Sequence, residues 1–245
     1  MLLQDLAAIE VVNGKELPIN KGTMLTRVIY KYWYHNGEMQ AVRQLLDIRD
    51  CRILSATILD QWASFIWIRR KTMSLSGKKI IILAENFYED LELWYPYYRL
   101  KEEGADVKIV GMPGVENYGS KYGYPVKPDL TPQEVEIEKI DALLVPGGYA
   151  PDKLRRYPEM LELVRKAFDQ GSVIGMICHA GWVPISAGIV RGKKVTSVSA
   201  IKDDMVNAGG EWLDQEVVVD GNLISSRTPA DLPAYCKAII AALNE

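Results

Sequence analysis

The chain has 245 residues, of which 48% are hydrophobic and 25% are charged, and its formal net charge is −3. This composition is typical of a globular protein, and the small net charge favours neither a nucleic acid nor an anionic membrane as a partner. The cysteines Cys51, Cys178 and Cys236 form no CxxC pair, and the chain lacks a GxGxxG or GxxxxGK[ST] loop. We therefore expect no disulfide framework, no metal and no cofactor, and a reducing, cytoplasmic location. The N-terminus has no basic leader and no apolar run reaches roughly 18 residues, so neither a signal peptide nor a membrane span is expected.

The first 72 residues differ in character from the rest and carry no chemical motif. Ile9–Leu17 is predicted to form a hairpin around Asn13-Gly14, a strong turn dipeptide, and Gln40–Arg70 is predicted to be helical. Met73 and the sequence after it are typical of a protein start. Two interpretations remain open: residues 1–72 are an N-terminal extension to a domain at 73–245, or they are a gene-model artefact.

From Lys78 onward, apolar runs alternate with helical patterns. Strands are predicted at Lys79–Ala84, Asp106–Val110, Asp141–Val145, Ser172–Ile177, Lys194–Ser197, Glu216–Val219 and Leu223–Ser226. Helices are predicted at Asp90–Glu103, at Pro158–Gln170, from Cys178 to Ala187 and at Ala230–Leu243, and an aromatic excursion or hairpin is predicted at Gly119–Lys127. This alternation predicts an α/β fold, with a mostly parallel sheet covered by helices on both faces, as in flavodoxin-like three-layer sandwiches.

Cys178 is the main candidate for chemistry. It directly follows an apolar strand and precedes a helix, a position typical of a nucleophile elbow. The helix N-terminus favours a thiolate of lowered pKa, and Glu89, near the end of the first strand, could fix the hydrogen bonding of the sulfur. The alternative is that Cys178 is a small buried core residue. Cys236 lies inside the last predicted helix and is expected to be structural.

Two further features surround this candidate. His179 is the only histidine of the main domain, since His35 lies in the first segment, so a cysteine–histidine mechanism must use it. His179 could equally be a structural or solvent-facing residue. Gly147-Gly148 is either a plain turn or a place where backbone N–H groups approach a ligand, as an oxyanion hole requires.

Several long blocks carry a family resemblance. They include KIIILAENFYEDLELWYPYYRLKEEG, DALLVPGGYAPDKLR and VIGMICHAGWVPISAGIVRGKKVTS. In order and spacing, from about Lys78 to Leu243, the chain resembles the ThiJ/PfpI superfamily, specifically the PfpI-type intracellular protease branch with its class I glutamine amidotransferase-like fold.

The resemblance implies roles for five residues. Cys178 would be the nucleophile and His179 its neighbouring histidine. Glu89 would be the buried acid at the sulfur. The backbone N–H groups of Gly148 and His179 would form the oxyanion hole. Asp152 would reach the histidine of a neighbouring subunit, which implies a homo-oligomer, either a dimer or a hexamer built from dimers.

Three functions follow from this resemblance and stay open. The first is a cysteine hydrolase of the intracellular peptidase type that acts on peptides. The second is a glyoxalase or protein deglycase that uses the same cysteine and glutamate on a small carbonyl substrate. The third is a stress or redox-sensing protein whose thiolate is oxidised. Membership of a fold family does not choose among them.

Overall fold

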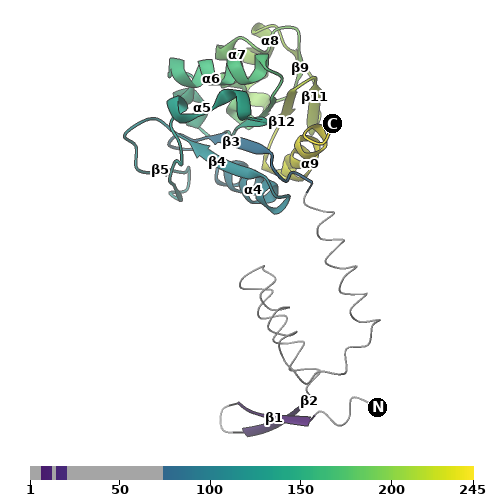
Figure 1. Cartoon of the computed structure of the whole chain (residues 1–245). Coiled ribbons are helices and arrows are strands. Elements are labelled where there is room, and N and C mark those ends of the chain that lie inside the picture. Colours follow the sequence, from purple (N-terminus) through teal and green to yellow (C-terminus); the bar gives the residue numbers. More distant parts are fainter. Residues whose placement is uncertain (1–6, 13–14, 21–73) are drawn as a thin grey trace. The chain divides into compact units, whose positions relative to one another are not determined.

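The computed structural model describes residues 7–12, 15–20 and 74–245, and the chain divides into two units, Met1–Phe65 and Ile66–Glu245. In the first unit, strands β1 (Ala7–Val12) and β2 (Lys15–Asn20) pair antiparallel, which confirms the predicted hairpin (Figure 1). The helix predicted at Gln40–Arg70 lies outside the described residues.

The second unit is built around one six-stranded sheet. Its strands are β3 (Lys79–Leu83), β4 (Asp106–Val110), β7 (Ala142–Val145), β8 (Val173–Ile177), β11 (Val217–Asp220) and β12 (Leu223–Ser226). They are arranged in the order β11-β12-β8-β7-β3-β4. All neighbours are parallel except β11 and β12. This arrangement confirms the predicted flavodoxin-like α/β fold.

The apolar side chains of β3 are buried on both faces of the sheet. Successive side chains of a strand point to opposite faces. Ile80 and Ile82 belong to one buried core cluster, whereas Ile81 and Leu83 belong to a second. All four side chains are at most 4% exposed. A continuous apolar run is therefore what a strand buried between two helical layers requires.

The helices cover the two faces of the sheet (Figure 1). Leu93 and Leu100 of α4 (Asp90–Glu102) and Tyr235 and Ile239 of α9 (Leu232–Ala242) belong to the core cluster of Ile80. The cluster of Ile81 receives side chains from helices on the other face. These are α5 (Ala150–Leu154), α6 (Pro158–Asp169), α7 (Trp182–Ala187) and α8 (Lys202–Asn207). Short 3₁₀ turns occur at Pro132–Glu134, Ile137–Lys139, Cys178–Gly181, Ser199–Ile201 and Pro229–Asp231.

Two short strand pairs lie outside the central sheet. β5 (Tyr118–Gly119) and β6 (Pro125–Val126) pair antiparallel, which confirms the hairpin predicted at Gly119–Lys127. β9 (Lys194–Val195) pairs with β10 (Glu211–Trp212) instead of joining the main sheet. The predicted strand at Lys194–Ser197 is therefore too long, because the amide of the next residue, Thr196, donates to the Ser225 hydroxyl at 2.9 Å instead of to a strand.

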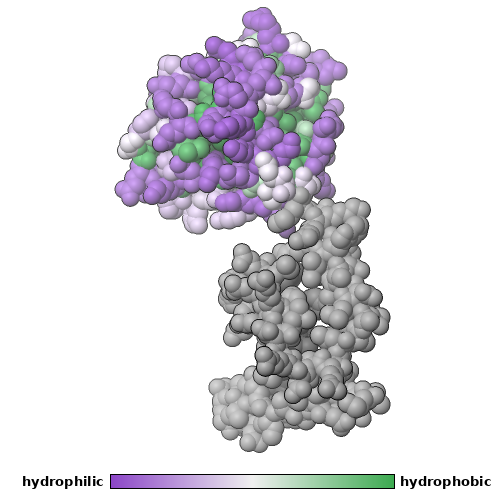
Figure 2. Space-filling model, viewed as in Figure 1, coloured by the Kyte–Doolittle hydropathy of each residue, from purple (hydrophilic) through white to green (hydrophobic). Residues whose placement is uncertain are grey.

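Figure 2 shows mainly hydrophilic side chains on the visible face of residues 74–245, with smaller hydrophobic areas between them. Among the residues that the structure describes, no helix has both the length and the apolar character needed to cross a membrane.

Candidate active site

Three neighbouring strands end at the same edge of the sheet. β8 ends just before Cys178, β7 ends two residues before Gly147, and β3 leads through a loop into α4. The strands β8, β7 and β3 lie side by side in parallel, so their carboxyl ends converge. Ligand sites of open α/β sheets form at such edges. The fold therefore brings segments from residues 84–92, 147–149 and 178–179 together.

Cys178 has a strained backbone, with φ of 60°. A positive φ is uncommon for a residue with a side chain and costs about 1–3 kcal/mol, which the surrounding structure must supply. The chain turns here directly from β8 into the 3₁₀ turn Cys178–Gly181. The sharp turn is that of a nucleophile elbow, as predicted, and it leaves the thiol partly exposed.

The two glycines after β7 leave no space for a side chain. A Cβ at Gly147 would lie 2.5 Å from the Glu92 carboxylate and 2.8 Å from Cβ of Cys178. A Cβ at Gly148, whose φ is 78°, would lie 2.4 Å from the Phe87 carbonyl oxygen. The N–H groups of Gly148 and His179 both donate to the sulfur of Cys178. These two amides are the pair predicted to form an oxyanion hole, and the structure brings them together at the thiol.

Glu92, and not Glu89, is the acid at the sulfur, which corrects the expectation for Glu89. Glu92 is 2% exposed, its Oε2 accepts the Gly147 N–H at 2.8 Å, and its carboxyl contacts Cys178. Glu89 is the residue before the first turn of α4 and pairs with Lys121 at 3.3 Å. The reason is the helix period: Glu92 lies in the first turn, on the buried face of α4 with Pro96 and Leu100.

Burial governs the protonation of this pair. It raises the pKa of Glu92 to about 7, and the Glu89 charge adds to that rise, whereas the Gly147 N–H opposes it. Burial, and after it the Glu92 charge, raise the pKa of Cys178 to about 12 against the opposing amides of His179 and Gly148. The predicted low pKa of the thiol is therefore wrong, because burial is the largest cause of the rise and the Glu92 charge is the second. The 3₁₀ turn and the six-residue α7 that follow it supply too small a dipole to outweigh burial.

The state of Glu92 decides the state of the thiol. Two anions in contact inside a buried site are disfavoured, so the groups titrate as a pair. Oε1 of Glu92 receives no hydrogen bond from the described residues, which leaves this oxygen free to carry a proton. A protonated Glu92 removes the repulsion that raises the pKa of Cys178. A thiolate at Cys178 therefore requires a protonated Glu92 beside it.

His179 lies beside the thiol of Cys178, as its place in the sequence predicted. Its Nδ1 is 3.3 Å from the sulfur of Cys178, and its ring lies 5.3 Å from that of Trp182. Burial, together with the positive charge of Lys121, lowers the pKa of His179. The neutral imidazole can therefore accept the thiol proton. Within the described part of the chain, no carboxylate bonds its other nitrogen.

Asp152 lies on α5 and is engaged within its own subunit. Its carboxylate forms an ion pair with Arg156, one helical turn further on, and 44% of its side chain is exposed. Asp can also cap the first turn of a helix, but α5 has no side-chain capping hydrogen bond. The single subunit does not bring Asp152 to His179.

Sequence reasoning missed Glu92 and Lys121. The signal for Glu92 was its spacing of four and eight residues from Pro96 and Leu100, which places it on the apolar face of a helix. Lys121 gave no comparable signal, because its approach to Glu89 depends on how the β5–β6 hairpin folds back onto α4.

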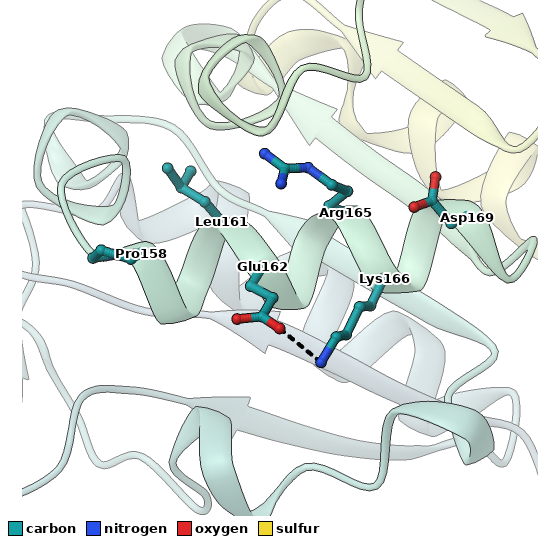
Figure 3. Close-up of a pocket in the computed structure, with 6 residues that line it drawn as sticks. All are labelled: Pro158, Leu161, Glu162, Arg165, Lys166 and Asp169. Atoms are coloured by element: carbon teal, nitrogen blue, oxygen red, sulfur yellow. Dashed lines mark ion pairs between the residues drawn. The ribbon is translucent and has the colours of Figure 1, made fainter.

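A separate hollow of about 420 Å³ lies along α6 (Figure 3). It is lined by Pro158, Leu161, Glu162, Arg165, Lys166 and Asp169. No cysteine or histidine faces it, so the candidate chemistry stays with Cys178.

Comparison with curated proteins places this geometry in context. The deglycase PH1704 of Pyrococcus horikoshii is 49% identical over 166 residues, which are 68% of this chain and 99% of that protein. Protein/nucleic acid deglycase 2 of Escherichia coli is 39% identical over 69% of this chain and 99% of its own length. YraA of Bacillus subtilis, whose name contains the term cysteine protease, is 35% identical over 65% of this chain and 94% of its own. These relatives indicate a cysteine-dependent enzyme of the hydrolase or deglycase type.

Solved structures share the same domain. DJ-1beta of Drosophila melanogaster superimposes with a TM-score of 0.65 at 26% identity, over 69% of this chain and 92% of its own. A two-domain Anabaena variabilis protein, with DJ-1/ThiJ/PfpI-like and ferritin-like domains, gives 0.66 at 41% identity over 68% of this chain and 48% of its own. The model of the DJ-1/PfpI family matches residues 78–242. The chain therefore belongs to the DJ-1/PfpI family.

Proposed function

We propose that this chain is a glyoxalase or protein deglycase, in which Cys178 attacks a reactive carbonyl and Glu92 moves the protons. The substrate class is a 2-oxoaldehyde such as methylglyoxal, either free or attached to a protein side chain. The deglycase names of PH1704 and of the Escherichia coli relative support this choice.

One observation carries the proposal: the buried Glu92 carboxyl contacts the thiol and has a pKa raised to about 7. A group with a pKa near the working pH is best suited to give and take protons. Glu92 can therefore act as an acid when the carbonyl is attacked and as a base afterwards.

The reaction follows from these positions. The Cys178 thiolate adds to the aldehyde carbon, and the carbonyl oxygen receives the proton of Glu92 while the amides of Gly148 and His179 stabilise its developing charge. Glu92, now a carboxylate, takes the proton of that carbon and delivers it to the neighbouring carbon, while the hydroxyl proton passes to the neighbouring oxygen, which leaves the thioester of a 2-hydroxy acid. Water hydrolyses the thioester, releases a 2-hydroxy acid and restores the thiol. A reducing compartment such as the cytosol would keep Cys178 in the required state.

A peptidase is the second candidate. The 3.3 Å approach of His179 Nδ1 to the sulfur favours it, since a cysteine hydrolase needs a base at its nucleophile. An orienting acid for His179 would then have to come from elsewhere. We propose that Asp152 of a neighbouring subunit supplies it in a homo-oligomer, either a dimer or a hexamer built from dimers.

One preparation tested on two substrates separates these functions. The glyoxalase or deglycase proposal is supported if the wild type consumes methylglyoxal but hydrolyses no peptide, and if Cys178→Ala and Glu92→Gln both lose the methylglyoxal activity. Peptide hydrolysis that survives Glu92→Gln contradicts it and favours the peptidase.

The shared site has its own test. Light scattering should show more than a monomer. If the protein has peptidase activity, mixing Cys178→Ala with Asp152→Ala subunits should restore part of it, because some sites receive both intact residues. A fully active monomer, or no recovery after proven subunit exchange, would exclude the shared site.

A further inference from the structure

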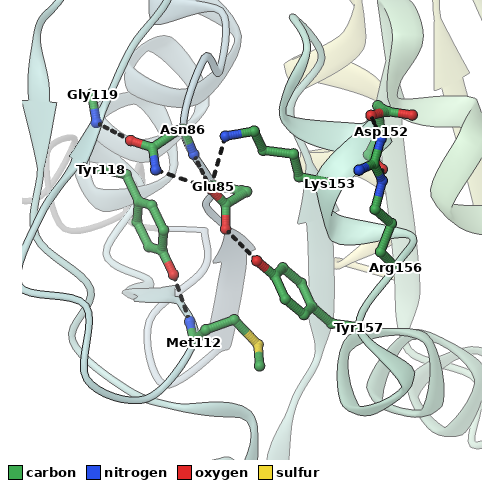
Figure 4. Close-up of polar contacts among 9 residues, drawn as sticks. All are labelled: Glu85, Asn86, Met112, Tyr118, Gly119, Asp152, Lys153, Arg156 and Tyr157. Atoms are coloured by element: carbon green, nitrogen blue, oxygen red, sulfur yellow. Dashed lines mark hydrogen bonds and ion pairs between the residues drawn. The ribbon is translucent and has the colours of Figure 1, made fainter.

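A buried carboxylate lies at the end of β3, beside the proposed active site but outside its chemistry. Glu85 is 4% exposed and is surrounded by donors from separate segments (Figure 4). Its Oε1 accepts the backbone N–H of Asn86 at 2.7 Å and lies 3.8 Å from Nζ of Lys153, while its Oε2 accepts the Tyr157 hydroxyl at 3.2 Å. Such a group is costly to bury unless its partners are held in place.

Lys153 connects this carboxylate to the loop that follows β3. Its ammonium lies 4.9 Å from the centre of the Phe87 ring, within the range of a cation–π contact. The lysine is on α5, and Tyr157 directly precedes α6. Glu85, Lys153 and Tyr157, which we call the brace, therefore join the end of β3 to the α5–α6 segment.

Phe87 needs such support. Its φ is 67°, although it is not a glycine, and 52% of its side chain is exposed. A backbone strained in this way persists only where neighbouring groups impose it. The Phe87 N–H donates to the Gly119 carbonyl at 2.7 Å, and its own carbonyl accepts the Tyr149 N–H at 2.8 Å.

The Phe87 loop also defines where Gly148 lies. Tyr88 and Gly148 form an antiparallel bridge, and the residues on both sides of Gly148 are bonded to the loop. These bonds are Tyr149 N–H to the Phe87 carbonyl at 2.8 Å and Glu89 N–H to the Gly147 carbonyl at 3.2 Å. The amide of Gly148 points to the sulfur of Cys178. Any shift of the loop therefore moves a donor of the proposed oxyanion hole.

We propose that the brace positions the Gly148 amide beside Cys178 by holding the strained Phe87 loop. Its members are positioning residues, because none of them touches the sulfur. The expected effect on turnover rests on the proposed function, whereas the effect on the thiol does not.

The test compares full-length variants by two readouts. The first is the rate at which iodoacetamide alkylates Cys178 at pH 8, followed by peptide mass spectrometry. Lys153→Met should slow it by about tenfold, because a misplaced amide stabilises the thiolate less. The second is turnover of methylglyoxal, in which kcat should fall by about tenfold with little change in KM.

The controls separate positioning from general stability. Lys153→Arg, which keeps the charge, should restore both readouts to within about twofold. Lys166→Met removes the exposed ion pair between Lys166 and Glu162, which is drawn in Figure 3 and has an N–O distance of 2.7 Å, and it should change neither readout. If Lys153→Met does not fold, Glu85→Gln and the milder Tyr157→Phe provide the same comparison.

Slower alkylation that arginine rescues supports the brace even if the chain turns over no carbonyl substrate. The proposal is overturned if a folded Lys153→Met protein is alkylated at Cys178 at the wild-type rate, even if its melting temperature is lower. The same holds for folded Glu85→Gln and Tyr157→Phe proteins if Lys153→Met does not fold. Such an outcome would leave the function of Cys178 and Glu92 untouched.

Discussion

Replacement of Glu92 by glutamine should make the stability of the protein less dependent on pH. Burial raises the pKa of this carboxyl from 4.5 to about 7. Between these values the folded chain keeps a proton that the unfolded chain releases, so the free energy of unfolding falls as the pH rises. Each pKa unit corresponds to about 1.4 kcal/mol, so the full penalty is about 3 kcal/mol above pH 7 and vanishes below pH 4.5.

Glutamine avoids this penalty and keeps the local geometry. Its carbonyl oxygen can accept the Gly147 N–H, and its amide can donate to the sulfur, as a protonated Glu92 does. Relative to the wild type, Glu92→Gln should therefore gain up to about 3 kcal/mol between pH 4.5 and pH 8.5.

Urea unfolding of the full chain at both pH values, followed by near-ultraviolet circular dichroism at equal protein concentrations, measures this gain. Glu162→Gln is the matched control, because this exposed carboxylate pairs with Lys166 and should change stability by less than about 0.5 kcal/mol. An equal stability difference between Glu92→Gln and the wild type at the two pH values would refute the reasoning.

The same variant separates two roles of Glu92. Loss of its charge removes a cause of the raised pKa of Cys178, so alkylation at pH 8 should become faster. Loss of its proton should lower kcat on methylglyoxal by about 100-fold or more. Slower alkylation together with slower turnover would instead indicate a disturbed site.

Three further predictions concern other parts of the domain. Gly148→Ala should lower both the stability and kcat, because its Cβ would lie 2.4 Å from the Phe87 carbonyl oxygen. Thermal unfolding and steady-state kinetics measure the two losses, and wild-type values of both would contradict this packing. Lys121→Met should raise the pKa of His179, since the lysine charge lowers it; an NMR titration of the imidazole would show an unchanged or lower value if this were incorrect. A chain that begins at Met73 should fold cooperatively, because the family match and the regular α/β pattern both begin after that residue. If this shorter chain is insoluble, or lacks a near-ultraviolet circular dichroism signal, the residues before Met73 are needed to complete the core.

The central sheet and the position of Cys178 at its edge could be predicted from the amino-acid pattern alone. Apolar runs such as Ile80–Leu83 are long enough to be buried on two faces, and helical periods between them force parallel strands. The carboxyl ends of such strands meet at one edge, which is why Cys178 and Gly148 could be assigned to one site without coordinates. The strand predicted at Lys194–Ser197 was too long, because its end is set by a hydrogen bond from Thr196 to the distant Ser225.

The identity of the acid that contacts the sulfur, and the shift of its pKa, depend on how the chain packs in three dimensions. Glu92 lies in the first turn of α4, whereas Glu89 precedes the helix in an extended conformation, and their spacing of three residues does not by itself say which of them faces the sulfur. Packing of Leu93, Pro96 and Leu100 against the core sets the rotation of α4 and turns Glu92 inward, while the hairpin brings Lys121 to Glu89. The raised pKa values follow from burial and from neighbouring charges, which depend on distances in space and not on distance along the chain.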